Sequence, residues 1–177
     1  MPENNHELQE DVPAVASDCH LPEDFTLVVL AGGASSRMGK EKSDLILDGQ
    51  TFLETQIRKG RQLGAKKILI SGYHGDCCSE EVVPDRIPGQ GPLGGLESCL
   101  RKAETAKCLV LGVDTPLVPV EELRSLLKYT MEEADKPVTM LCHNGKEESL
   151  MAVYDAGLYK EITDFLESGR SSVYRFL

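Results

Sequence analysis

The chain has 177 residues, the usual length of one globular domain, and it is long enough to bury a core without disulfide or metal support. An apolar content of 41% argues against a largely disordered protein. The formal net charge of −10 argues against a general nucleic-acid-binding protein, because such proteins present a basic face.

The chain begins with a segment that we expect to be a flexible extension. Residues 1–23 are polar and acidic and contain no periodic apolar pattern. Residues 25–30 (FTLVVL) then form a short, partly β-branched apolar run that ends at glycines, which predicts a buried strand of a parallel sheet. A loop is expected over residues 31–50.

A capping box predicts the first helix. Thr51 and Glu54 have the spacing of that motif, and the helix is expected to run to about Leu63 and to end near Gly64. A second buried strand is predicted at residues 67–71. The remaining predicted elements are a short strand at 82–83, a helix from the glycine-rich segment 89–95 to residue 103, a strand at 108–113, a helix with Pro119 at its first position that ends near residue 133, strands at 137–142 and 150–154, and a helix at 158–167.

The alternation of strands and helices predicts the fold class. It indicates right-handed βαβ units and a three-layer, Rossmann-like α/β domain with a mostly parallel sheet. Ligands of such folds bind at the carboxyl ends of the strands. Three polar or glycine-rich segments follow predicted strands, at residues 31–42, 71–74 and 114–116, and we expect them to meet at one site.

The loop from Leu30 to Lys42 (LAGGASSRMGKEK) has the composition of a phosphate-binding loop. Its glycines let backbone N–H groups approach an anion, its serines donate hydrogen bonds, and Arg37, Lys40 and Lys42 supply positive charge. It is not a Walker A loop, because its spacing is longer by one residue and Glu41 stands in place of the Ser or Thr. The alternative interpretation is an ordinary glycine-rich turn between a strand and a helix.

This loop resembles the L-A-G-G-x-S-x-R-M-G-x-x-K signature of molybdenum cofactor guanylyltransferases, which are nucleotidyltransferases with a GT-A-like Rossmann core. Every fixed position of the signature is filled. Asp85 with residues 91–96 (GPLGGL) is similar to the Asp and G-P-L-x-G segment of the family, and residues 114–116 (DTP) resemble its D-x-P segment. The likeness runs from Phe25 to Leu177 and implies one nucleotidyltransferase domain over residues 24–177.

The resemblance also implies an activity. It implies transfer of GMP from GTP to the molybdopterin form of the molybdenum cofactor, with Mg²⁺ required, pyrophosphate released, and transient contacts with proteins that deliver the cofactor. It implies catalytic roles for Arg37, Lys42 and Asp114, the last also as the Mg²⁺ ligand. The residues that it implies at the nucleotide are Leu30, Ala31, Gly32, Gly33, Ser35, Lys42, Ser71, Asp85, Gly94 and Asp114.

Two of these residues have structural alternatives. Asp114 ends an apolar strand, where one carboxylate together with substrate phosphates suits Mg²⁺. Judged from the residues alone, a turn or helix-capping aspartate explains Asp114 equally well. Asp85 lies in the turn-like sequence Pro84-Asp85-Arg86, where an aspartate needs no function.

The sequence departs from the family pattern in two places. Ser71 stands where the family commonly has an Asn near the base, and the family usually continues past Leu177 into another strand and an N-x-N-T-P-E-like segment near the metal. A related cytidylyl- or sugar-phosphate nucleotidyltransferase and a non-catalytic nucleotide-binding module therefore stay as alternatives. The Ala31-Gly32-Gly33 form of the loop favours GTP over CTP.

The cysteines and the hydropathy indicate a reducing, aqueous compartment. The six cysteines contain no C-x-x-C motif; Cys77-Cys78 is interpreted as a reduced surface turn rather than a redox pair, and Cys99 and Cys108 as small core residues. No run of 18 apolar residues and no apolar signal-peptide core occurs, so we expect a cytoplasmic protein without a membrane or nucleic-acid partner. His74 and His143 are expected to be solvated.

Overall fold

A six-stranded sheet forms the centre of the computed structural model, which describes residues 24–32, 42–75 and 79–177. The strand order is β5-β4-β1-β6-β8-β7. In chain order the strands are β1 (Phe25–Leu30), β4 (Lys67–Ser71), β5 (Glu81–Val83), β6 (Lys107–Gly112), β7 (Val138–His143) and β8 (Lys146–Asp155). The first four are mutually parallel, whereas β8 runs antiparallel to both β6 and β7. The predicted mostly parallel sheet is confirmed.

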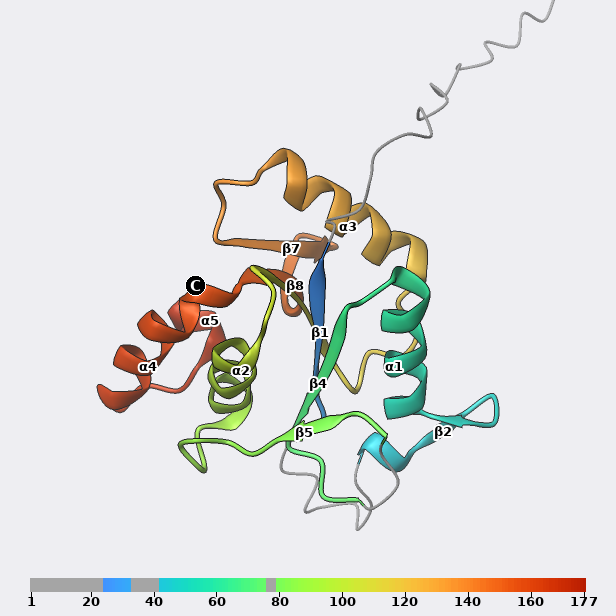
Figure 1. Cartoon of the computed structure of the whole chain (residues 1–177), viewed down its shortest axis with the longest axis horizontal. Coiled ribbons are helices and arrows are strands. Elements are labelled where there is room, and N and C mark those ends of the chain that lie inside the picture. Colours follow the sequence, from blue (N-terminus) through green and yellow to red (C-terminus); the bar gives the residue numbers. More distant parts are fainter. Residues whose placement is uncertain (1–23, 33–41, 76–78) are drawn as a thin grey trace, which may run out of the picture.

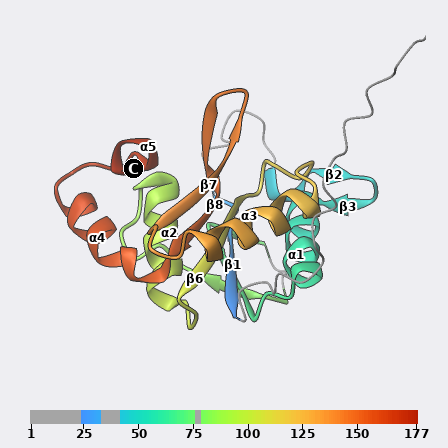
Figure 2. The same cartoon turned by 90° about the horizontal axis from the view of Figure 1, so that it is seen from above.

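Helices cover both faces of this sheet (Figures 1 and 2). One face carries α1 (Phe52–Leu63) and α3 (Val120–Glu132). The other carries α2 (Gly91–Lys102), α4 (Tyr159–Glu167) and the short α5 (Val173–Phe176). The result is the three-layer α/β architecture that the alternation of elements predicts.

The central strand β1 shows why the apolar run at residues 25–30 is continuous. Leu27 and Val29 pack into the core beneath α1 and α3, while Val28 and Leu30 pack into the core beneath α2 and α4. Because successive side chains of a strand point to opposite faces, a strand covered on both faces needs apolar residues at every position.

The predicted capping box at the start of α1 is confirmed. The Glu54 N–H donates to the Thr51 hydroxyl at 3.1 Å, and the Thr51 N–H donates to the Glu54 carboxylate at 2.7 Å. The helix ends at Leu63, followed by Gly64 with a positive φ of 83°. Both ends of α1 are therefore fixed by local sequence, as expected.

Two hairpin turns were not predicted. Asp48 and Gly49, with φ of 51° and 81°, connect a small hairpin of β2 (Ile46–Leu47) and β3 (Gln50–Thr51) inside the segment expected to be a loop. Asn144 and Gly145, with φ of 51° and 74°, join β7 to β8, so that β8 begins at Lys146 and not at residue 150. Asp-Gly and Asn-Gly pairs favour such turns because both positions need a positive φ.

One helix prediction needs correction, and one helix was not predicted. Pro119 has an extended ψ of 144° and precedes the helix as its N-cap, so α3 begins at Val120. The helix at Val173–Phe176 was not predicted. It is a single turn, too short to give a periodic apolar pattern in the sequence.

The structure confirms the interpretation of two cysteines. Cys99 and Cys108 are completely buried, and burial raises the pKa of each thiol to about 12. The interpretation of Cys77-Cys78 lies outside the described residues. Within the part of the chain that the structure describes, no helix has the length and apolarity needed to cross a membrane.

Candidate functional site

The carboxyl ends of three neighbouring strands meet at one edge of the sheet. Leu30, the last residue of β1, is paired with Ser71 of β4 on one side and with Gly112 of β6 on the other. The Ala31 N–H donates to the Ser71 carbonyl at 2.8 Å, and the Val113 N–H donates to the Leu30 carbonyl at 3.0 Å. The three segments expected to converge, at residues 31–42, 71–74 and 114–116, therefore do so in their described parts.

A cavity of about 460 Å³ opens at this edge, within the usual size range of small-molecule sites. A smaller one of about 190 Å³ adjoins it and shares Leu30, Ala31, Gly32, Lys42 and Pro92. The larger cavity is completed by Ser71, Gly72, His74, Asp85, Gly89 and Gly91, and the smaller one by Gly112, Val113, Asp114 and Leu150. His74 is exposed, as expected, but it lies in the cavity lining.

Two glycines in the lining of the larger cavity, Gly32 and Gly72, bring their backbones close together. A Cβ atom on Gly32 would lie 3.0 Å from Gly72 Cα, and one on Gly72 would lie 2.4 Å from Gly32 Cα. Gly72 also has a φ of +72°. Only glycine fits at Gly72, a position that sequence reasoning missed although a glycine directly after a buried strand signals such a contact. The Gly32 N–H donates to the Ser71 carbonyl at 3.2 Å, so in this structure the N–H bonds within the protein.

Ser71 and Asp85 form the wall of the cavity next to α2. The Ser71 hydroxyl, which is buried, donates to Asp85 Oδ1 at 2.8 Å. A Cβ atom on Gly95 would lie 2.1 Å from Ser71 Oγ and 3.3 Å from Asp85 Oδ1. The absence of a side chain at Gly95 therefore gives this hydrogen bond its space. A Cβ atom on Gly94 would lie 3.7 Å from Asp85 Oδ2, an ordinary contact distance.

The amino end of α2 faces the same cavity. Gly91 and Pro92, in the first turn of α2, line the cavity, and the N-cap residue Gln90 makes no side-chain capping bond. The first N–H groups of a helix have no partner within the helix and carry partial positive charge, which favours anions. This edge of the cavity is therefore suited to a phosphate or a carboxylate.

An ion pair lies at the other side of the site. Lys42 Nζ is 3.0 Å from Asp114 Oδ2, and about half of each side chain is exposed, 51% and 50%. Exposed pairs of this kind contribute only about 0–1 kcal/mol, so a ligand can replace one partner at little cost. The two residues thus offer one cation and one carboxylate at the same point of the crevice.

The donor set at Asp114 fits one kind of metal binding. Among the described residues there is no group of three or more His, Cys, Asp or Glu side chains that could hold a metal. Magnesium needs only one or two carboxylates when substrate phosphates supply further oxygen ligands. Asp114 therefore suits a Mg²⁺ ion that arrives with a polyphosphate, and not a permanent protein-only metal centre.

The turn that carries Asp114 is fastened to α1. Gln56 Nε2 donates to the Gly112 carbonyl at 2.8 Å and to the Thr115 carbonyl at 3.1 Å. Lys59 Nζ donates to the Pro116 carbonyl at 2.7 Å. Burial, together with the charge of Arg58, lowers the pKa of Lys59 to about 8. Sequence reasoning missed Gln56 and Lys59.

The turn that carries Asp85 is fastened to α2 in a similar way. Glu97, only 1% exposed, accepts hydrogen bonds from Arg101 at 2.6 Å and from Arg86 at 3.3 Å. Burial would raise the pKa of Glu97, but hydrogen bonds from Arg101 and Thr163 and the charges of both arginines hold it below its usual value. Asp85 therefore stands beside a residue, Arg86, that is tied to the helix.

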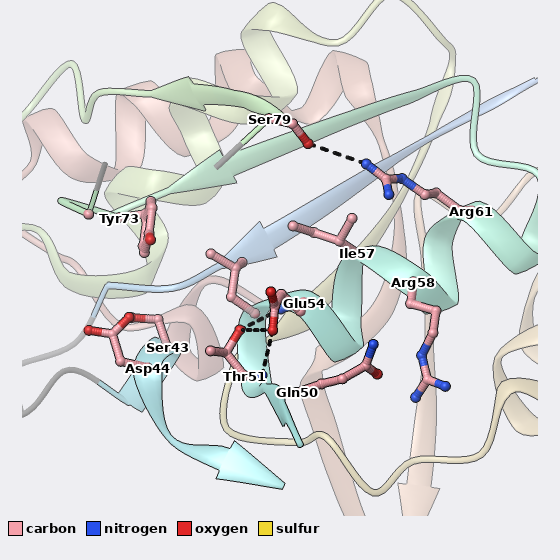
Figure 3. Close-up of a pocket in the computed structure, with 12 residues that line it drawn as sticks. Ser43, Asp44, Gln50, Thr51, Glu54, Ile57, Arg58, Arg61, Tyr73 and Ser79 are labelled. Carbon is pink, nitrogen blue, oxygen red and sulfur yellow. Dashed lines mark hydrogen bonds between the residues drawn. The ribbon is translucent and has the colours of Figure 1, made fainter. Parts of the chain in front are cut away.

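A larger cavity, of about 710 Å³, lies beside the start of α1 (Figure 3). Figure 3 shows Thr51 and Glu54 hydrogen-bonded to each other at the start of α1, and Arg61 donating a hydrogen bond to Ser79. Arg61 also pairs with Glu80. The charged groups of Glu54 and Arg61 thus bind within the protein, and none of the nucleotide residues implied by the sequence lines this cavity.

Comparison with known proteins identifies the fold and the family. The family model described as "MobA-like NTP transferase domain" matches residues 27–177 of this chain. A protein of Carboxydothermus hydrogenoformans named "probable molybdenum cofactor guanylyltransferase" is 33% identical over 155 residues, which is 87% of this chain and 77% of that protein. A protein of the same name from Pelotomaculum thermopropionicum is 34% identical over 154 residues, covering 85% and 73%. The crystal structure of molybdopterin-guanine dinucleotide biosynthesis protein A from Archaeoglobus fulgidus shares the fold, with a TM-score of 0.69, 22% identity and coverage of 85% and 77%.

The chain belongs to the MobA-like NTP transferase domain family. It is therefore a nucleotidyltransferase, as the sequence resemblance implies. Of the site residues implied by the sequence, this nucleotidyltransferase gathers seven around the paired cavities: Leu30, Ala31, Gly32, Lys42, Ser71, Asp85 and Asp114. Gly94 is a neighbour of Asp85, while Gly33, Ser35 and Arg37 lie outside the described residues.

The space at Gly95 gives a direct test of the cavity wall. We expect Gly95→Ala to weaken nucleotide binding by about tenfold, because the added Cβ displaces the Ser71 hydroxyl from Asp85. Calorimetric titration with GTP measures the effect. Gly157→Ala is the matched control, since a Cβ there meets nothing within 4 Å. If Gly95→Ala binds GTP with unchanged affinity, the Ser71–Asp85 hydrogen bond does not contribute to nucleotide binding.

Proposed function

We propose that this nucleotidyltransferase transfers GMP from GTP to molybdenum-bearing molybdopterin. The acceptor group is the phosphate of the pterin, and the reaction depends on Mg²⁺ and releases pyrophosphate. The observation that carries the proposal is the meeting of Ala31, Ser71 and the Lys42–Asp114 pair around one crevice at the carboxyl ends of β1, β4 and β6. The names of the related guanylyltransferases support GTP and the pterin as the substrate pair.

The proposed reaction needs little covalent chemistry from the protein. An oxygen of the acceptor phosphate attacks the α-phosphorus of GTP and forms a new P–O bond. The bond between the α-phosphorus and the oxygen that bridges to the β-phosphorus breaks, and its electron pair leaves with pyrophosphate. Since the attacking phosphate is already anionic, no side-chain nucleophile is required. The work of the protein is to align the reactants and to offset negative charge.

Each part of the crevice has a proposed role. The amino end of α2, with Gly91 and Pro92 in its first turn, attracts phosphate, and the Ser71–Asp85 wall contacts the nucleoside. Lys42 releases Asp114 and binds the polyphosphate, where its ammonium offsets charge that develops during transfer. When bound, Mg²⁺ held by Asp114 would neutralise phosphate oxygens.

Nucleotide selectivity and the acceptor are tested together. Pyrophosphate release is measured with GTP, CTP or ATP in the presence of Mg²⁺, with and without the molybdenum-bearing pterin. We expect acceptor-dependent release that is at least about tenfold faster with GTP, since buried polar groups that match one base are left unpaired by another.

The other outcomes identify the alternatives. Equal rates with the three nucleotides would refute the guanine assignment, and faster release with CTP would favour a cytidylyltransferase. Pyrophosphate release with a sugar phosphate and not with the pterin would identify the sugar phosphate as the acceptor. Binding of GTP without any release would favour a non-catalytic nucleotide-binding module.

A further inference from the structure

Helix α1 places two polar side chains on its buried face. Gln56 is 0% exposed and Lys59 is 5% exposed, although Leu53, Ile57 and Leu63 on the same helix are part of an apolar core. Burying an amide or an ammonium costs free energy unless the group forms hydrogen bonds. The reason for these two residues must therefore be found in what they bind.

Both side chains bind carbonyl groups of one short turn. Gln56 reaches the carbonyl groups of Gly112 and Thr115, and Lys59 reaches that of Pro116. Asp114 lies in the middle of this turn. Three of the five carbonyl groups from Gly112 to Pro116 are thus held from the side of α1, across 56 or more positions of sequence.

The orientation of the Gln56 amide is determined by this turn. Every hydrogen bond of Nε2 goes to an oxygen, including the Thr115 hydroxyl at 3.3 Å. The opposite orientation would direct Oε1 at the Gly112 and Thr115 carbonyl oxygens, and acceptors do not bind acceptors. In the present orientation Oε1 is buried and has no hydrogen-bond partner within the described chain. The side chain therefore leaves one acceptor without a partner while its N–H groups hold the turn.

The helix that carries Gln56 and Lys59 has a well-defined start. The Thr51–Glu54 capping box, visible in Figure 3, sets the first turn of the helix, and Gln56 follows Glu54 by two residues. The Asp114 carboxylate itself accepts a hydrogen bond from Lys42 at 3.0 Å, and both residues line the smaller cavity. The backbone of the turn is held from α1 while its carboxylate faces the crevice.

We propose that Gln56 and Lys59 are positioning residues that fix the turn Gly112–Pro116, so that the Asp114 carboxylate is held in place for a metal–triphosphate complex. The inference rests on the proposed function. Groups that orient a metal-binding carboxylate set metal affinity without touching the metal, and their loss costs about 10- to 100-fold in affinity or activity. Neither residue belongs to the signature segments through which the sequence resembles its family.

The test separates metal-dependent from metal-independent binding. GTP is titrated by calorimetry into the wild-type protein and Gln56→Leu, in EDTA and in Mg²⁺. Leucine keeps the approximate volume of Gln56 and removes its hydrogen bonds. We expect Mg²⁺ to raise the GTP affinity of the wild type and the Mg²⁺ concentration needed for half of that gain to rise about tenfold or more in Gln56→Leu. GTP affinity in EDTA is expected to change less than about twofold, since Gln56 does not line the cavities.

A matched control removes a buried hydrogen bond elsewhere. Thr130→Val, in the last turn of α3, deletes a buried hydroxyl that donates to the Leu126 carbonyl at 2.9 Å and forms no hydrogen bond with the turn. It is expected to lower the melting temperature without changing the Mg²⁺ requirement. Lys59→Met, which removes the bond to Pro116 and keeps the apolar stem, tests the same inference if Gln56→Leu does not fold.

The outcomes separate the inference from the proposed function. A normal Mg²⁺ requirement in Gln56→Leu and Lys59→Met, or an equal loss of GTP affinity in EDTA and in Mg²⁺, would overturn the positioning role and leave a purely structural one. A wild-type protein whose GTP affinity does not respond to Mg²⁺ would instead refute the proposed metal–triphosphate site, and the inference with it.

Discussion

Asp114→Asn is expected to abolish Mg²⁺-dependent transfer while the fold is retained. The amide has nearly the same size as the carboxylate, and the Asp114 side chain is half exposed, so packing is unaffected. A neutral amide is a poor ligand for a cation that gives up water reluctantly. Loss of a metal that stabilises transition-state charge by several kcal/mol should slow turnover by at least about a hundredfold.

Turnover, melting temperature and GTP affinity in EDTA are measured together for Asp114→Asn. Metal-free GTP affinity should be retained or slightly raised, because a carboxylate near the triphosphate is removed. If Asp114 only shapes its turn, asparagine serves equally well, and the variant would have normal turnover. That result would remove the central residue of the proposed mechanism.

Lys42→Ala is expected to weaken GTP binding by about 1.5–3 kcal/mol, roughly 10- to 150-fold, through loss of one charge-assisted contact. The fold should be retained, since the Lys42 side chain is 51% exposed and its pair with Asp114 contributes little to stability. The same change removes the counterion of Asp114, so the free carboxylate should bind Mg²⁺ alone more tightly than in the wild type. The two opposite effects are measured by separate calorimetric titrations with GTP in EDTA and with Mg²⁺ without nucleotide.

Lys66→Met is the matched control for Lys42→Ala. Lys66 also forms an exposed ion pair, 2.6 Å from Asp24, but it does not line the paired cavities. The Lys66→Met variant should bind GTP and Mg²⁺ as the wild type does in both titrations. Unfolding of Lys42→Ala by circular dichroism, or unchanged GTP affinity, would show that Lys42 has a structural role. Arg37→Ala is expected from the sequence to weaken GTP binding in the same way.

The sheet and its ligand edge could be predicted because their signals are local. The continuous apolar run at residues 25–30 requires a strand that is covered on both faces, and the Thr51–Glu54 spacing marks the start of α1. Asp114 could be placed in the crevice because it ends an apolar strand of a parallel sheet. The Asn144-Gly145 turn also has a local signal, but the weak alternation on either side of it obscured the full length of β8.

The supporting residues of the site could not be predicted because their partners are distant in sequence. Gln56 and Lys59 are polar residues on a buried helix face, and only the fold shows that this face meets the turn at 112–116. Gly72 depends in the same way on the approach of Gly32, which follows β1. A polar residue at an apolar helix position indicates that a partner exists, but not which one.

The pairing of Leu30 with both Ser71 and Gly112 also bears on how the protein folds. The crevice has no walls until three strands from separate parts of the chain have joined, with β1 between the other two. Each of these parallel pairings closes a loop of about 40 to 80 residues, a non-local step that is slow compared with helix formation. The capacity to bind nucleotide should therefore arise late in folding, when the helices have already formed, and a nascent chain that ends before β6 carries the complete glycine-rich loop but only part of the pocket.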